Sequence, residues 1–98
     1  MKMLHLIFQT PIEIAILDRI EVGDAVVFVG NSAVSLLRQG CLAEKLAAMA
    51  NDRSLSVLSD DLVARGIAAN TLVEGIEVIG YSGLVALTLD HEVIQSWL

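Results

Sequence analysis

The sequence alternates short apolar runs with stretches in which apolar residues recur at helical spacing. The apolar runs occupy residues 3–8, 25–29, 54–58 and 76–79. The run at 25–29 is unbroken and β-branched, which is typical of a parallel strand covered on both faces. Helical stretches separate the runs, and the longest reaches residue 50 with an interruption at Gln39–Gly40. The pattern predicts an α/β fold, a three-layer α/β/α sandwich of flavodoxin-like type with a mainly parallel sheet.

Capping signals mark where the predicted helices begin and end. After the first run, Thr10 suits an N-cap, Pro11 the first helical position and Glu13 the far side of a capping box. The stretch 59–61, Ser-Asp-Asp, predicts a further helix start whose acidic first turn complements the helix dipole. Gly66 stands where a C-terminal glycine belongs. The connections are therefore short, as an alternating α/β chain requires.

The last part of the chain predicts one more helix and an apolar tail. Ser82 is expected to cap a helix that runs to about residue 89. Ile94, Trp97 and Leu98 follow it. A free tail would leave these large side chains in water, so we expect it to dock on the body of the protein or on a partner.

Composition adds a reason to expect a partner. The chain has 98 residues, enough for one domain spanning residues 1–98, and 55% of them are hydrophobic while only 18% are charged. A domain this short exposes much surface per residue and should need more polar residues, not fewer. Surplus apolar surface usually marks a contact, so we expect a subunit interface; a merely poorly soluble protein is the alternative.

Charge and cysteine content indicate which partners and which cellular compartment to expect. Lys and Arg total 6 against 12 Asp and Glu, a net charge of −6, which disfavours direct binding to nucleic acid. No apolar stretch approaches the roughly 20 residues that a bilayer requires. Gln9–Pro11 ends the first run early, so we expect neither an export signal nor a membrane segment. A single cysteine permits no internal disulfide, and we expect a cytoplasmic protein.

The loops after the predicted strands offer little chemistry, although ligands of open parallel sheets bind there. Residues 9–11, Gln-Thr-Pro, lack the Ser/Thr-rich loop of a flavin phosphate site. Gly30–Ser32 falls far short of a dinucleotide or nucleotide phosphate loop. Asp60 and Asp61 are interpreted as groups that complement a helix dipole rather than as metal ligands. We therefore expect no cofactor and no metal.

Three titratable sites have structural interpretations. His5 lies inside the first apolar run, where a lone histidine is usually a hydrogen-bonded core or interface residue rather than an acid or base. His91 is expected at the surface or in an interface. Asp61 and Arg65 are spaced as an exposed helical ion pair, worth about 0.3–0.5 kcal/mol.

Cys41 is the one candidate nucleophile. It follows Gly40 near a predicted helix start, where a dipole stabilises a thiolate. Against this, no basic residue is adjacent, and a free cysteine is commonly a small buried apolar side chain. The structural interpretation is favoured, so no catalytic residue is assigned and Cys41 stays as the alternative.

Several segments together resemble the TusB/DsrH family. Leu4–His5 followed by Thr10–Pro11 is similar to the opening of that family. Gly23–Asp24 before an apolar strand is similar to its second strand, and residues 61–66, Asp-Leu-Val-Ala-Arg-Gly, to its most specific helix. The closing segment resembles the family at Tyr81, Val85, Leu87, His91 and Gln95–Trp97. The resemblance covers essentially the whole chain.

The resemblance implies a DsrE/DsrF/DsrH-like fold and a place in a TusB–TusC–TusD heterohexamer. In that complex, persulfide sulfur passes from a TusA-like donor, through a cysteine on the TusD-like subunit, to a TusE-like acceptor. The relay serves 2-thiolation of the wobble uridine in certain tRNAs. TusB-type subunits are non-catalytic members of this sulfurtransferase complex, and they hold no cofactor.

Two departures from the family pattern bear on the branch of function. Family members commonly have Asp-Gly after the second strand, where this chain has Gly30–Asn31. Some DsrH subunits of sulfur-oxidising bacteria carry a cysteine near the end of the first helix, where residues 18–20 have none. Cys41 falls elsewhere, so tRNA thiolation is favoured over sulfur oxidation. A stand-alone DsrE-like sulfur carrier using Cys41 and a homo-oligomeric α/β binding module remain alternatives.

Overall fold

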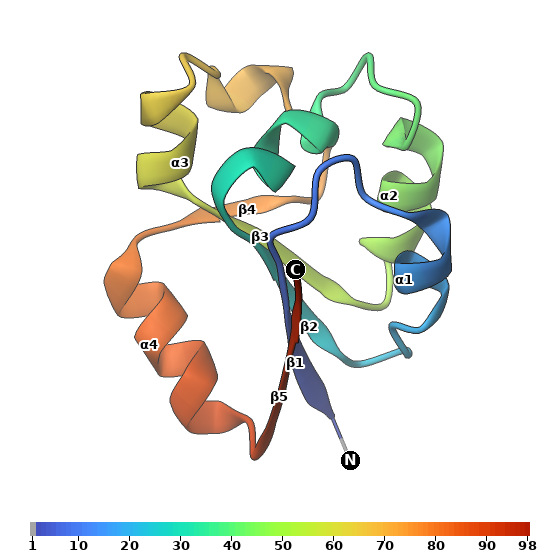
Figure 1. The fold of residues 1–98 in the computed structure, drawn as a ribbon, viewed down its shortest axis with the longest axis vertical. Coiled ribbons are helices and arrows are strands. Elements are labelled where there is room, and N and C mark those ends of the chain that lie inside the picture. The colour runs from blue at the N-terminus through green and yellow to red at the C-terminus, as the bar shows by residue number, and fades with distance from the viewer. Residues whose placement is uncertain (1) are drawn as a thin grey trace.

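A five-stranded, wholly parallel sheet forms the centre of the computed structural model, which describes residues 2–98 (Figure 1). The strand order is β4-β3-β2-β1-β5. Residue 1 lies outside the described part. The strands are β1 Met3–Ile7, β2 Ala25–Phe28, β3 Ser54–Leu58, β4 Glu77–Ile79 and β5 Val93–Trp97. The predicted α/β fold is confirmed, and the sheet has one strand more than the apolar runs indicate.

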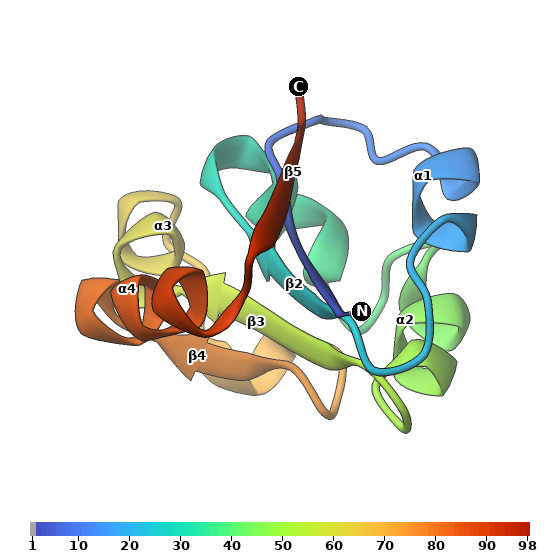
Figure 2. The ribbon, with the colours of Figure 1, turned by 90° about the horizontal axis from the view of Figure 1, so that it is seen from below.

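Short helices connect the strands and cover both faces of the sheet. They are α1 Ile14–Asp18, the 3-10 helix η1 Gly30–Leu36, α2 Ala43–Met49, α3 Ser59–Ala64, the 3-10 helix η2 Ala69–Thr71 and α4 Tyr81–Asp90. Both views place α4 across the sheet from α1 and α2 (Figures 1 and 2). Among residues 2–98, no helix has the length and apolar character needed to cross a bilayer.

The two faces of the sheet bury very different amounts of apolar surface. The larger core joins one face to α1, η1, α2 and α3, and Phe28 and Leu46 are fully buried within it. The smaller core contains only Leu4, Ala25, Val27 and Leu58, with Leu84 and Leu87 of α4 packed against it. The face under α4 is therefore thinly covered.

The apolar tail is a strand, not only a docked end. β5 pairs with β1 in parallel along five residues, from Met3 opposite Val93 to Ile7 opposite Trp97. Gln95 and Ser96 interrupt the apolar run, so the periodicity does not predict a strand there. Docking on the body is confirmed for the backbone, which pairs with β1, and for the half-buried Trp97. Ile94 and Leu98 stay 44% and 88% exposed, so the tail does not bury all of its apolar side chains as expected.

The first helix begins later than the capping signals predict. Its N-cap is Glu13, without a side-chain cap, and the Thr10–Pro11 peptide bond is cis. In a capping box Thr10 would accept the Glu13 amide, but the Gln9 side-chain oxygen accepts that N–H at 3.0 Å. The predicted capping box is therefore wrong. A neighbouring side chain satisfies the same donor.

Other boundaries are closer to the prediction. α3 ends before Gly66, whose φ of 66° lies in the left-handed region that favours glycine. The predicted cap Ser59 lies inside α3, and Ser82 lies inside α4, which follows Gly80. Each helix thus begins slightly earlier than its nearest serine indicates.

The buried Asp24 carboxylate joins the start of β1 to the turn before β2. It accepts the Met3 amide at 3.0 Å and the Glu21 amide at 3.1 Å. Its Oδ2 also lies 2.9 Å from Nε2 of His5, and both side chains are almost fully buried. Burial alone would raise the pKa of Asp24, but the hydrogen bonds from Met3, His5 and Glu21 outweigh burial and lower that pKa below the ordinary aspartate value.

His5 carries this contact across β1 to β5. The indole N–H of Trp97 lies 3.1 Å from Nδ1 of His5, and indole nitrogen can only donate. Nδ1 must therefore accept, so the proton of neutral His5 sits on Nε2 and is donated to Asp24. The two rings stack at 6.3 Å, and the Arg19 guanidinium lies 5.8 Å from the Trp97 ring centre. His5 is thus the hydrogen-bonded core residue that the sequence indicates.

Replacing Asp24 with Asn should change both stability and its pH dependence. A lowered folded-state pKa stabilises the protein above about pH 3.9, and that contribution is lost as pH falls through the folded-state pKa. In Asp24→Asn, an NH2 group replaces one of the two oxygens that accept hydrogen bonds, so at least one buried donor loses its acceptor. We therefore expect the free energy of unfolding to fall by about 1–3 kcal/mol at neutral pH. Urea unfolding followed by circular dichroism between about pH 2 and pH 7 measures both effects.

The matched control is Asp60→Asn, because Asp60 is an exposed carboxylate on α3. In the Asp24 variant, the free energy of unfolding should rise less steeply with pH than in the wild-type protein, whereas the control should follow the wild type. Equal pH dependence in all three proteins would show that Asp24 does not stabilise the fold through its charge.

Candidate functional site

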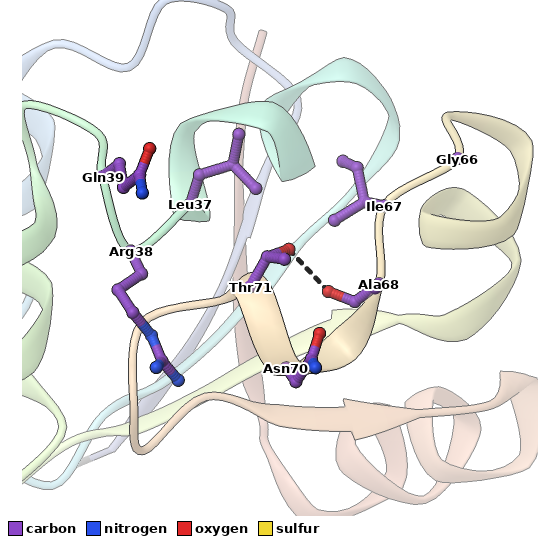
Figure 3. Close-up of a pocket in the computed structure, with 8 residues that line it drawn as sticks. All are labelled: Leu37, Arg38, Gln39, Gly66, Ile67, Ala68, Asn70 and Thr71. Carbon is purple, nitrogen blue, oxygen red and sulfur yellow. Dashed lines mark hydrogen bonds between the residues drawn. The ribbon is translucent and has the colours of Figure 1, made fainter.

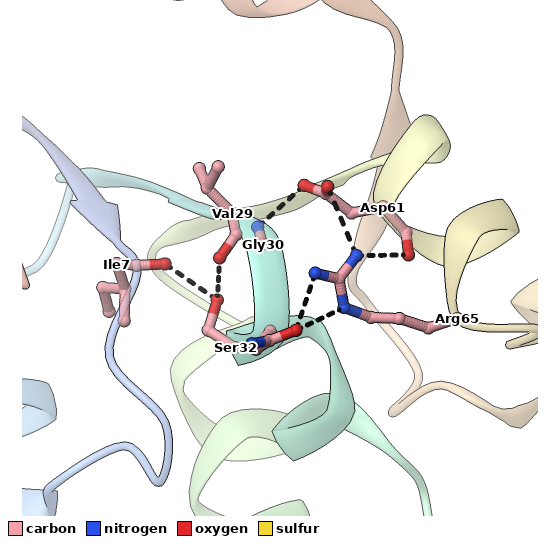
Figure 4. A network of polar contacts seen from close by, with 7 residues as sticks. Ile7, Val29, Gly30, Ser32, Asp61 and Arg65 are labelled. Carbon is pink, nitrogen blue, oxygen red and sulfur yellow. Dashed lines mark hydrogen bonds and ion pairs between the residues drawn. The ribbon is translucent and has the colours of Figure 1, made fainter.

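The carboxyl ends of the strands are the first place to look for a site, because ligands of open parallel sheets bind there. A polar network joins the loops at this edge (Figure 4). The Gly30 amide donates to Oδ2 of Asp61 at 2.8 Å. Arg65 donates from Nε and Nη2 to the Asn31 side-chain oxygen at 3.0 and 2.7 Å. α3 thereby holds the loop that follows β2.

Ser32 fixes the same loop from the other side. Its hydroxyl oxygen lies 2.8 Å from the carbonyl oxygens of both Ile7 and Val29, so its single proton is shared between the ends of β1 and β2 (Figure 4). Ser32 is fully buried. A buried hydroxyl with its hydrogen bonds satisfied in this way positions the loop, and its oxygen is not accessible as a nucleophile.

The Asp61–Arg65 pair is less exposed than its spacing suggests. The two side chains are 3.5 Å apart, with exposed fractions of 20% and 24%. Both also bind the loop at Gly30–Asn31, a contact between residues over 30 positions apart that spacing along one helix could not indicate. Asp60 is exposed beside them. Within residues 2–98, no three His, Cys, Asp or Glu side chains gather into a possible metal site.

Cys41 is exposed in the connection between η1 and α2, so its interpretation as a small buried apolar side chain is wrong. The helix begins at Ala43, after Leu42 as N-cap, so Cys41 lies two residues before the first helical residue. Among residues 2–98, the Cys41 thiol takes part in no hydrogen bond. The thiol is thus accessible, and no hydrogen-bond donor or acceptor is bound to it.

A hollow of about 570 Å³ lies between the η1–α2 connection and the α3–η2 connection (Figure 3). The Arg38 amide donates to the Thr71 carbonyl at 2.7 Å and joins the two connections. The hollow is lined by Leu37, Arg38, Gln39, Gly66, Ile67, Ala68, Asn70 and Thr71. Cys41 is not among them, and the lining holds no carboxylate or histidine. It therefore has no acid–base or nucleophilic pair.

The two histidines are engaged elsewhere. His5 uses both ring nitrogens inside the sheet, on Asp24 and Trp97. His91 donates from Nδ1 to the Leu87 carbonyl at 2.7 Å and so satisfies a carbonyl at the end of α4. Neither histidine forms a hydrogen bond with Ser32 or with the exposed Cys41. Both histidines are therefore engaged in contacts that hold the fold.

Comparison with solved structures gives the fold. The protein of unknown function MTH1491 from Methanobacterium thermoautotrophicum superposes with a TM-score of 0.77 at 17% identity, covering 98% of this chain and 97% of that one. The ychN protein from E. coli has a TM-score of 0.76 at 14% identity, covering 99% of this chain and 100% of its own. At these identities, the likeness shows a common fold.

Comparison of sequences gives the family. Protein TusB of Buchnera aphidicola subsp. Baizongia pistaciae is 32% identical, with 97% of this chain and 100% of that protein aligned. Protein TusB of Yersinia enterocolitica is also 32% identical, over 85% of this chain and 84% of its own length. The family model described as DsrH like protein matches residues 8–94. On this evidence the chain belongs to the DsrH-like protein family.

Proposed function

We propose that this chain is a non-catalytic subunit of a heteromeric sulfur-relay complex that supports 2-thiolation of the tRNA wobble uridine. The observation that carries the proposal is the 32% identity to a Protein TusB along 97% of this chain. TusC-like and TusD-like chains are its proposed partners in a cytoplasmic heterohexamer. A TusA-like donor and a TusE-like acceptor meet the complex transiently, and the active cysteine belongs to the TusD-like subunit.

The polar groups of the chain support a subunit without its own active site. Asp24, Asp61 and Ser32 are all satisfied by contacts within the fold. The exposed Cys41 thiol takes part in no hydrogen bond within residues 2–98. A sulfur carrier needs a substantial thiolate fraction, and such a cysteine normally has cationic or hydrogen-bonding neighbours. The chain thus acts as one DsrH-like domain that contributes binding surface.

The net charge of −6 fits a position in the relay before tRNA is bound. Phosphate backbones are bound chiefly by Lys and Arg, and this chain has twice as many carboxylates as cations. The proposed role therefore includes no direct contact with nucleic acid.

A second candidate function is a stand-alone DsrE-like sulfur carrier that uses Cys41. The observation in its favour is that Cys41 is exposed, as an attacking thiolate must be. The two functions differ in where sulfur is held: on Cys41 in the carrier, and on a partner's cysteine in the proposed complex.

The first prediction concerns assembly. The chain is rich in apolar residues and poor in charge, so we expect the isolated chain to form no well-defined monomer or oligomer. We expect it to form a stoichiometric complex with TusC-like and TusD-like chains. Co-expression followed by size-exclusion chromatography with light scattering measures this. A well-behaved monomer that elutes apart from both chains would overturn the proposal.

The second prediction concerns Cys41. Cys41→Ser should leave wobble-uridine thiolation in cells within about twofold of the wild-type level, because the sulfur does not pass through this residue. Substituting the active cysteine of the TusD-like partner in the same strain is the positive control, and it should abolish thiolation. A loss caused by Cys41→Ser, with the complex still assembled, would favour the carrier function.

A further inference from the structure

The outer face of α4 is an exposed apolar stripe. Tyr81, Val85 and Leu89 are spaced four residues apart, so they line one side of the helix. Their exposed fractions are 61%, 55% and 81%. Exposed single apolar residues are ordinary on protein surfaces, but three in a row on one helix form a continuous strip. We call these three residues the α4 stripe.

The opposite side of α4 is apolar as well. Leu84 and Leu87 pack against the smaller core, yet no residue of this ten-residue helix is fully buried. A helix that is apolar all round is normally buried on all sides, and Asp90 is the only charged residue in α4. Figures 1 and 2 show α4 standing out from the body of the protein. The outer side of α4 thus has the apolar composition of a helix surface that another protein covers.

The last third of the sequence, which includes α4, carries charges of one sign. From residue 66 to residue 98 there is no Lys or Arg, and the carboxylates in that stretch are Glu74, Glu77, Asp90 and Glu92. Glu77 pairs with Ser56 in the sheet, a position that faces the same side as the smaller core. Asp90 and Glu92 lie at and just beyond the end of α4. None of these carboxylates forms an ion pair within residues 2–98.

This acidic rim disfavours a second copy of the chain as the occupant. A twofold contact through α4 would place the same patch against itself, with an excess of carboxylates on both sides. Lys2, two residues before Leu4, is a cation on this face of the sheet, and its side chain lies against Gly23. Like charges brought together at an interface oppose association, whereas a partner with Lys or Arg at matching places would be attracted. Charge complementarity therefore selects a different protein.

We propose that the α4 stripe is the docking surface for a partner subunit that offers an apolar groove rimmed by Lys and Arg. The inference rests on the proposed function, because it assigns to this face one of the heteromeric contacts of the relay complex. Tyr81, Val85 and Leu89 enter the groove, and Glu77, Asp90 and Glu92 meet its basic rim.

Charged substitutions in the stripe test the apolar part of the contact. Val85→Glu and Leu89→Glu should each weaken binding to co-expressed TusC-like and TusD-like chains by about tenfold or more, because the carboxylate would be desolvated in the groove. Val63→Glu is the matched control, since Val63 is an 80% exposed apolar residue on α3. All three variants should keep the wild-type circular dichroism and unfolding midpoint, because the replaced side chains are exposed in the isolated chain.

Charge reversal tests the rim. The triple variant Glu77→Lys, Asp90→Lys, Glu92→Lys should bind the same partner chains more weakly, and its binding should no longer weaken as salt rises, because the attractive pairs are gone. Isothermal titration or surface binding at two salt concentrations measures both effects.

The outcomes separate this inference from the proposed function. If the complex forms and Val85→Glu and Leu89→Glu bind as tightly as Val63→Glu, the docking surface is wrong while the proposed function stands. The docking surface is equally wrong if the stripe variants abolish a homodimer of this chain. If the wild-type chain binds neither partner chain, the proposed function and this inference fall together.

Discussion

The Asp24 carboxylate is the contact on which the rest of the sheet depends. It is buried at the start of β2, and it holds the first amide of β1 together with the amide of the preceding turn. Through His5, it also fixes Trp97 on β5. One carboxylate thereby links segments that lie more than 70 residues apart. A buried carboxylate is costly unless its hydrogen bonds are complete, and here His5 and two amides complete them.

The five parallel strands of this short chain are covered very unequally on the two faces of the sheet. Parallel strands need covering on both faces, and the larger core supplies this on one side through α1, η1, α2 and α3. On the other side, α4 alone covers the sheet and does so loosely. Part of the surplus of apolar residues lies on α4, where Tyr81, Val85 and Leu89 are exposed, and the other exposed apolar side chains are spread over the remaining elements. A subunit of a larger assembly can leave such a face open, because a partner completes it.

Much of the fold follows from the pattern of residues. Apolar runs identify β1 to β4, and their alternation with helices indicates the parallel sheet. Periodicity cannot predict β5, because Gln95 and Ser96 are polar on an edge strand that keeps partial contact with water. The Asp24–His5–Trp97 connection cannot be predicted either. The sequence indicates that His5 is a core residue, but its partners are distant along the chain.

For the functional groups too, the sequence reveals local patterns, whereas contacts between distant residues appear only in the fold. Local spacing identifies the Asp61–Arg65 pair, and only the fold reveals that both residues hold Gly30–Asn31. Cys41 is the one nucleophile that the sequence offers, and the structure leaves it exposed, with no hydrogen bond to its thiol among the described residues. The family assignment, by contrast, depends on ordered motifs along the whole chain, which sequence comparison detects well.

Central to the proposed function is that the sulfur atom in transit through the relay is never attached to this chain. The most direct measurement is mass spectrometry of each subunit after the assembled complex has been loaded by a persulfidated TusA-like donor. We expect one added sulfur atom on a cysteine of the TusD-like partner and none on the peptide that contains Cys41. An added sulfur on Cys41 that then passes to the acceptor protein would contradict the non-catalytic role.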